Sequence, residues 1–117
     1  MKQSLIKEKS YSFALQIIRL YKSLLKQNEF VLPKQLLRSG TSIGANIEEA
    51  LAGQSRADFL SKMSIASKEA RETNYWLRFI RDSETIAKNE VKPLLTESES
   101  IVNILTSIVK ITAQKKS

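Results

Sequence analysis

The sequence predicts an all-α protein, an antiparallel up-down-up-down four-helix bundle that forms a single domain over residues 1–117. Three observations favour this class. The chain contains only three glycines and two prolines among 117 residues, whereas an all-β fold uses both residue types for its many turns. Apolar residues recur at every third or fourth position through four segments. The connections between these segments are short, and short loops join long helices as antiparallel neighbours.

The four helices are predicted over residues 5–27, 33–53, 56–82 and 88–113. Pro33 suits the first turn of the second helix, where its missing N–H needs no partner, and Gly53 stands where that helix is expected to stop. The Ser55 hydroxyl can cap the third helix, and the Asp58 carboxylate complements its dipole. Pro93 fits the first turn of the fourth helix and would kink it further in.

The third helix carries two apolar faces. Its first face has an apolar or small residue at every third or fourth position over residues 59–80 and is predicted to line the core. Its second face holds Ile65, Trp76 and Phe79, with Glu72 among them. A single four-helix core could leave this face uncovered, and a large exposed apolar patch is unusual in a soluble monomer. The second face therefore predicts a subunit contact, with one broad buried face as the alternative.

The second helix combines glycines with polar residues beside its apolar face. Gly40 and Gly44 each cost roughly 1 kcal/mol of helix propensity relative to alanine, so a close helix contact should offset them, either in the core or at a subunit interface. Ser42, Asn46 and Glu49 follow at i, i+4 and i+7 and predict a partly buried structural network; a ligand or nucleic-acid contact is the alternative. Their hydrogen-bonding partners are expected among Arg38, Glu69, Arg71, Glu72 and Asn74.

The chain is basic, with a formal charge of +7 and a pI near 9.8. Arg19, Lys22 and Lys26 lie at i, i+3 and i+7 on one side of the first helix and form what we call the basic stripe. The C-terminal tail adds Lys115 and Lys116. Such a stripe is either a solvated helix face or a contact surface, so RNA, DNA and an acidic protein are the candidate partners that the charge favours.

The residue types that the chain lacks exclude several classes of catalytic and metal-binding site. It contains no cysteine and no histidine, which excludes disulfides, thiolate nucleophiles and imidazole catalysis. The Glu-x-x-His motifs of di-iron bundles are therefore missing as well, and a purely carboxylate metal site is the alternative left open. We predict no catalytic residue, no metal, no cofactor and no enzymatic activity. Without a signal peptide or a long apolar stretch, the protein is expected to be cytoplasmic and free of membrane contact.

Two runs carry a family resemblance: LLRSGTSIGANIEEA at residues 36–50 and KEARETNYWL at residues 68–77. They resemble the bacterial 23S rRNA intervening sequence protein family, which is often labelled ribosomal-protein-like. The resemblance implies a four-helix bundle that assembles as a ring-like homopentamer, without established catalysis. A structurally similar relative, the accessory variability protein of diversity-generating retroelements, binds nucleic acid and a reverse transcriptase through a basic pentameric surface. The matching motif positions in this chain are Arg38, Ser42, Asn46, Glu49, Glu69, Glu72 and Trp76.

These observations lead to one functional prediction and one alternative. The protein is predicted to be a non-enzymatic homo-oligomer, a pentamer by resemblance, with an RNA- or DNA-binding or ribonucleoprotein-associated role. Few aromatic residues accompany the basic ones in the sequence, so contacts to phosphates are expected rather than stacking on bases. The alternative is a protein–protein interaction scaffold that does not bind nucleic acid.

Overall fold

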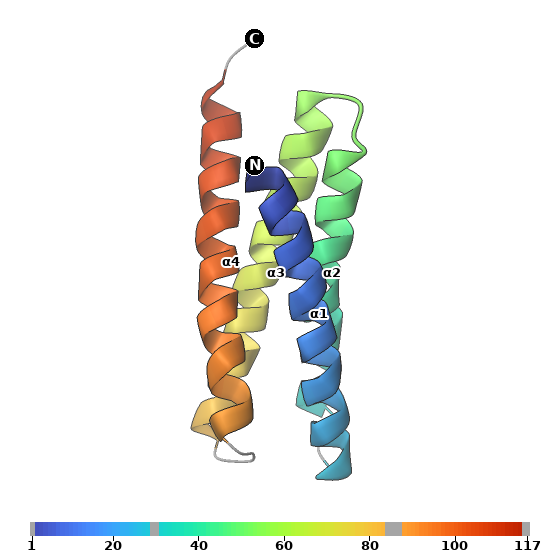
Figure 1. The fold of residues 1–117 in the computed structure, drawn as a ribbon, viewed down its shortest axis with the longest axis vertical. Helices are drawn as coiled ribbons and strands as arrows, with labels where there is room; N and C mark the ends of the chain where they lie inside the picture. Colours follow the sequence, from blue (N-terminus) through green and yellow to red (C-terminus); the bar gives the residue numbers. More distant parts are fainter. Residues whose placement is uncertain (1, 29–30, 84–87, 116–117) are drawn as a thin grey trace.

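The computed structural model describes residues 2–28, 31–83 and 88–115. These residues form four α-helices and no strand, which confirms the all-α class. Successive helices run in opposite directions, so the N-terminus of the first and the C-terminus of the last lie toward the same end of an elongated bundle (Figure 1). The helices are α1 (Lys2–Lys26), α2 (Val31–Leu51), α3 (Arg56–Asp82) and α4 (Lys88–Gln114).

The helix ends differ from the predicted ones by up to three residues, and local chemistry explains several of them. Asn28, the second residue after α1, adopts a left-handed conformation with φ of 62°; asparagine tolerates this conformation and ends helices with it. Pro33 is the third residue of α2 and so lies in its first turn. The Ser55 hydroxyl accepts a hydrogen bond from the Asp58 N–H at 3.1 Å and caps α3. Pro93, in contrast, is the sixth residue of α4, beyond the first turn.

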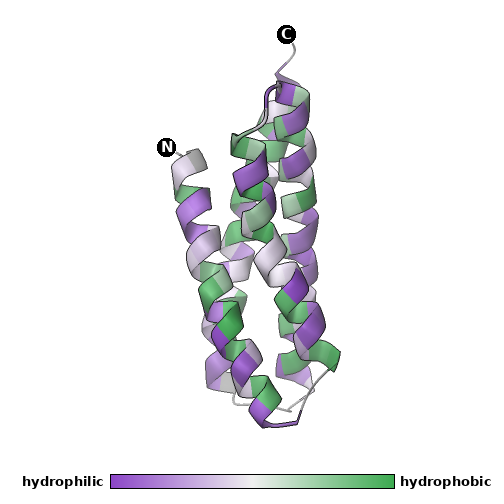
Figure 2. Cartoon of the chain, turned by 90° about the vertical axis from the view of Figure 1, so that its right-hand side faces the viewer, coloured by the Kyte–Doolittle hydropathy of each residue, from purple (hydrophilic) through white to green (hydrophobic). Residues whose placement is uncertain are grey.

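One hydrophobic core runs through the bundle. Each helix packs against two neighbours, α1 on α2, α2 on α3, α3 on α4 and α4 on α1, and α1 packs on α4 least extensively. Hydrophobic and hydrophilic residues alternate along each helix, as expected for helices with one buried and one solvent-facing side (Figure 2). The first face of α3 is buried as predicted, through Met63, Ala66, Ala70, Thr73, Leu77 and Ile80.

The two glycines of α2 lie against α1 within the bundle. A β carbon at Gly40 would stand 2.9 Å from both γ carbons of Ile17, and one at Gly44 would stand 3.4 Å from the Ser10 hydroxyl. Ile17 is fully buried and Ser10 nearly so. Of the two roles predicted for these glycines, close packing inside the bundle therefore has a clear physical basis at Gly40, where a side chain would overlap a neighbour.

Candidate functional site

A polar network joins α2 to α3 on the outside of the bundle. The Arg38 guanidinium donates to Glu69 Oε2 at 3.0 Å and to Glu72 Oε2. The Ser42 hydroxyl donates to the same oxygen of Glu69 at 2.5 Å. The indole N–H of Trp76 donates to Glu72 Oε2 at 2.9 Å. Five of the seven motif positions thus form one hydrogen-bonded unit that ties the two helices together.

The network changes the proton affinities of its charged groups. The hydrogen bond from Trp76, followed by the one from Arg38, lowers the pKa of the Glu72 carboxyl below its ordinary value. The carboxylate of Glu72 in turn raises the pKa of the Arg38 guanidinium above its ordinary value. Both shifts favour the charged forms, so the pair stays ionised over a wider pH range than the isolated side chains would.

The other two motif positions lie at the edge of this network. The Asn46 side-chain amide donates to the backbone oxygen of Ser42 at 2.9 Å and is half-buried. Glu49 is exposed and forms an ion pair with Lys62 at 2.8 Å. The predicted line of partly buried polar groups therefore holds for Ser42 and Asn46 and is wrong for Glu49, because α2 turns that position toward solvent beside α3.

Two of the expected partners belong to a different helix contact. Arg71 donates to the Thr106 hydroxyl at 2.9 Å, and the Asn74 amide donates to the buried Ser98 hydroxyl at 2.8 Å. Both contacts join α3 to α4 rather than to α2. The prediction that Arg71 and Asn74 serve the polar line of α2 was wrong, because these positions lie on the side of α3 that packs on α4.

Replacing Glu72 with glutamine is expected to reduce the free energy of unfolding at neutral pH by roughly 0.5–1 kcal/mol, because the pair is partly exposed and screened by solvent. The folded-state pKa of Glu72 lies below its ordinary value of 4.5. Its contribution is thus complete above that value and is lost as the pH falls through the lowered pKa. Urea unfolding at a series of pH values measures this.

The matched control for this prediction is Glu8→Gln, which makes the same charge change at an exposed position of α1. It should leave the stability near that of the wild type. The stability difference between Glu72→Gln and wild type should shrink as the pH is lowered below 4.5. A difference that is independent of pH would contradict the assignment of an ionised, hydrogen-bonded Glu72.

The second face of α3 remains uncovered in a single chain. Ile65 is 39% exposed, and Tyr75 and Phe79 are each 46% exposed. Trp76 is half-buried against the core, and its ring lies 5.0 Å from Tyr75 and 6.3 Å from Phe79 between centroids. We call Ile65, Tyr75, Trp76 and Phe79 the apolar patch. The core of one chain does not bury both faces of α3.

The basic stripe projects from the outer side of α1. Arg19, Lys22 and Lys26 are exposed, and none forms an ion pair with another residue in the described part of the chain. Lys115 is also exposed, but it follows α4 at the opposite end of a bundle that is 51 Å long (Figure 1). Lys116 lies outside the described residues. The structure therefore does not bring Lys115 to the surface formed by the stripe.

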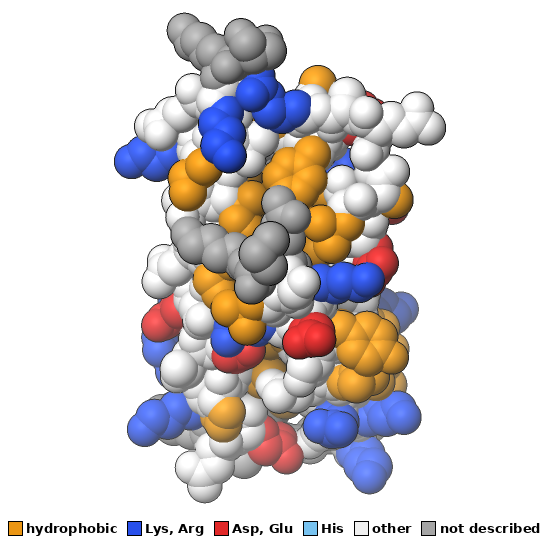
Figure 3. All heavy atoms as spheres, turned by 45° about the horizontal axis from the view of Figure 1, so that its top comes forward, with side chains coloured by type: hydrophobic (Ala, Val, Ile, Leu, Met, Phe, Trp, Pro, Cys, Tyr) orange, Lys and Arg blue, Asp and Glu red, His pale blue; other side chains and the backbone are white. Residues whose placement is uncertain are grey.

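The end of the bundle near the C-terminus also carries lysine and arginine side chains, here next to exposed hydrophobic surface (Figure 3). A shallow groove at this end is lined by Arg56 and Leu60 from α3 and by Thr112, Ala113 and Lys115. Basic residues thus occur at both ends of the bundle.

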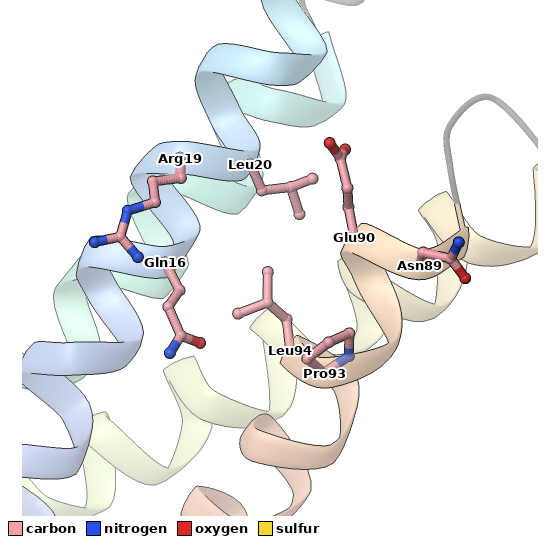
Figure 4. Close-up of a pocket in the computed structure, with 7 residues that line it drawn as sticks. All are labelled: Gln16, Arg19, Leu20, Asn89, Glu90, Pro93 and Leu94. Carbon is pink, nitrogen blue, oxygen red and sulfur yellow. The ribbon is translucent and has the colours of Figure 1, made fainter.

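Sequence reasoning did not identify a groove between α1 and α4. It has a volume of about 360 Å³ and is lined by Gln16, Arg19, Leu20, Asn89, Glu90, Pro93 and Leu94 (Figure 4). The Ser23 hydroxyl donates to the Glu90 carboxylate at 3.1 Å from the α1 side. Its lining residues come from the two ends of the sequence, so only the folded structure brings them together. The one sequence signal is Pro93, which interrupts the hydrogen bonding of α4 beside the groove.

Neither a metal site nor a membrane span is found in residues 2–28, 31–83 and 88–115. No group of three or more acidic, histidine or cysteine side chains in these residues could hold a metal ion. No helix in the same part of the chain is long and apolar enough to cross a membrane.

Fold and surface together define a small, basic four-helix bundle in which a polar network joins α2 and α3 and an apolar patch is left uncovered. The chain belongs to the 23S rRNA-intervening sequence protein family, whose sequence model matches residues 2–107. The family resemblance of the two motif runs is thereby confirmed.

A solved structure supports this assignment. It is a protein with unknown function from the S23 ribosomal protein family of Bacteroides thetaiotaomicron VPI-5482. The two sequences are 50% identical, and the structures superimpose with a TM-score of 0.90 over 94% of this chain and 99% of that chain. No curated protein matches the chain.

Proposed function

We propose that this protein is a non-enzymatic, cytoplasmic homo-oligomer, a pentamer, that binds RNA or DNA through the basic stripe of α1. The observation that carries the proposal is the set of three neighbouring, exposed cations that no described acidic residue neutralises. Their spacing along one helix side suits a polyanion such as a phosphate backbone. The ribosome-related name of the family is consistent with a nucleic-acid partner.

Self-association is supported by the apolar patch. Tyr75 and Phe79 expose large side chains beside the half-buried Trp76, and Ile65 is exposed about three turns earlier on the same helix. Aromatic residues of this kind are enriched at the centres of protein interfaces. Burying the patch against another copy of the chain would remove it from water. The family resemblance supplies the number of copies.

Assembly would strengthen an otherwise modest electrostatic attraction. Each chain carries a formal charge of +7, and a pentamer multiplies both this charge and the number of stripes fivefold. Several weak contacts on one rigid particle raise the effective concentration for the next contact. The proposal therefore expects strong, salt-sensitive binding from the oligomer and weak binding from a single chain.

A protein–protein interaction scaffold is the second candidate function. The observation that favours it is the same apolar patch, because a different protein could cover it instead of a second copy. An acidic partner could then dock on the basic stripe. In this case the protein would form complexes without any affinity for nucleic acid.

The test is a titration of a labelled single-stranded RNA of about ten nucleotides, between about 50 and 200 mM salt. Lys22→Glu/Lys26→Glu is expected to weaken binding about tenfold or more at the lower salt. The dependence of log affinity on log salt should also become shallower, by roughly 0.7 for each phosphate that the variant no longer neutralises. Fluorescence anisotropy measures both quantities.

The matched control is Lys92→Glu/Lys110→Glu, which makes the same charge change at two exposed positions of α4. This variant should bind nearly as tightly as the wild type. Equal weakening in both variants would show that net charge, rather than the stripe, determines affinity. If the wild-type protein does not bind RNA at the lower salt, the nucleic-acid-binding function is excluded and the scaffold is the remaining candidate.

A further inference from the structure

The groove between α1 and α4 combines an apolar floor with polar groups above it. Leu20 and Leu94 face each other across the gap, with the Gln16 amide on one side and the Glu90 carboxylate on the other (Figure 4). Both leucines are 4% exposed, so they form the floor rather than the rim. A volume of about 360 Å³ is at the small end for ligand sites, which suits a single flat ring system.

The Glu90 carboxylate supplies hydrogen-bond acceptors at one end of the groove. Its oxygens accept from the Ser23 hydroxyl at 3.1 and 3.4 Å and have further lone pairs that can accept from a ligand. In α4 the backbone carbonyl of Asn89 lacks its usual helical partner, because Pro93 has no N–H to donate. A ligand that binds both oxygens of the Glu90 carboxylate must therefore present two neighbouring donors.

Among the nucleobases, guanine meets this requirement. Its Watson–Crick edge carries a ring N–H next to an amino group, both donors, and a carboxylate can accept from the two together. Adenine, cytosine and uracil each place an acceptor beside their donor on that edge, which a carboxylate repels. The edge is free only in an unpaired base, as in single-stranded loops and ends.

The groove is continuous with the basic stripe, because Arg19 belongs to both. The Arg19 side chain leaves the outer side of α1, away from the gap (Figure 4), and Lys22 and Lys26 follow on the same helix side. A strand whose phosphates lie on the stripe can therefore turn a base toward the floor formed by Leu20 and Leu94. Phosphate contacts would position the strand, and the groove would read the base.

We propose that this groove binds an unpaired guanine of a single-stranded nucleic acid whose phosphates lie on the basic stripe, with Glu90 as the residue that selects guanine. The inference rests on the proposed nucleic-acid-binding function and adds a base preference to it. Gln16 supports the base from the α1 side, and Ser23 positions the Glu90 carboxylate.

The test compares two labelled oligouridylate RNAs of about ten nucleotides, one with a central guanosine and one with a central adenosine. Their phosphates are equal in number, so only the groove can distinguish them. Wild-type protein should bind the guanosine RNA about tenfold more tightly. Glu90→Gln should remove most of this preference, because an amide presents a donor where guanine also has one.

Glu99→Gln is the matched control. It makes the same charge change at an exposed position of α4 that lines a different groove, the one between α3 and α4, and it should keep the tenfold preference. Tight binding of both RNAs without preference would overturn the guanine site and leave the proposed function standing. Absence of binding to either RNA would overturn both. Free GMP that competes as tightly as the RNA would overturn the assignment to a nucleic-acid strand.

Discussion

Phe79→Asp is expected to convert the proposed oligomer into single chains. Phe79 is 46% exposed and lies in a ring cluster with Tyr75 and Trp76. In an assembly that covers the patch, the aspartate would be buried as an unpaired charge, which costs several kcal/mol at each interface. A penalty of this size weakens association by a factor of about 100 or more. Sedimentation velocity measures the change in mass.

The fold of the single chain should survive this substitution, because nearly half of the Phe79 side chain already contacts solvent. Ile111→Asp is the matched control: Ile111 is 44% exposed on α4, away from the patch, and the variant should stay oligomeric. Circular dichroism should show a helical chain in both variants. An oligomer that persists in Phe79→Asp would exclude the apolar patch as the interface.

Gly40→Ala and Gly44→Ala are expected to change stability in opposite directions. At Gly40 a β carbon would stand 2.9 Å from two carbons of the fully buried Ile17, so α1 or α2 must move. Overpacking of this kind destabilises a protein by roughly 1–3 kcal/mol, whereas the higher helix propensity of alanine relative to glycine stabilises it by about 1 kcal/mol. The free energy of unfolding should therefore fall by up to about 2 kcal/mol.

At Gly44 the nearest atom to a new β carbon is the Ser10 hydroxyl, at the ordinary contact distance of 3.4 Å. No steric overlap then offsets the gain in helix propensity. The Gly44→Ala variant should be as stable as the wild type or more stable by up to about 1 kcal/mol. Urea unfolding of both variants measures the difference. Equal effects at the two sites would contradict the close approach of α1 and α2 at Gly40.

The fold could be predicted from the sequence because helical periodicity and turn chemistry agree along the chain. The face of α3 from Met63 to Ile80 is buried as predicted, since only one packing direction covers that many apolar positions. The capping role of Ser55 follows from a local motif. The left-handed conformation of Asn28 was not predicted, because asparagine ends helices less regularly than glycine.

The surface features were harder to predict because they depend on contacts between distant residues. Ser42 and Glu72 could be assigned to a network, but the sequence did not show that Glu49 would instead pair with Lys62 in solvent. Arg71 faces α4 because of the rotation of α3 in the bundle, which periodicity fixes only approximately. The groove that contains Glu90 depends on how far α1 and α4 separate, which no local pattern encodes.

The polar motif of the family has a structural explanation in this protein, which does not require a catalytic role. Arg38 pairs with Glu69 and Glu72, and Glu72 accepts the indole N–H of Trp76 in the apolar patch. In the proposed assembly this network would hold Trp76 in a fixed position and so maintain the shape of the subunit interface. The opposite helix, α1, would remain free to bind nucleic acid, because α1 and α3 are not neighbours in the bundle.

Native mass spectrometry of the protein mixed with a single-stranded RNA of about ten nucleotides tests the central claim most directly. The proposed function predicts a particle of five 13.3 kDa chains that gains the mass of the RNA, and it predicts that raising the salt removes the RNA before the chains separate. A single chain that does not bind RNA, or an oligomer whose mass the RNA leaves unchanged, would contradict it.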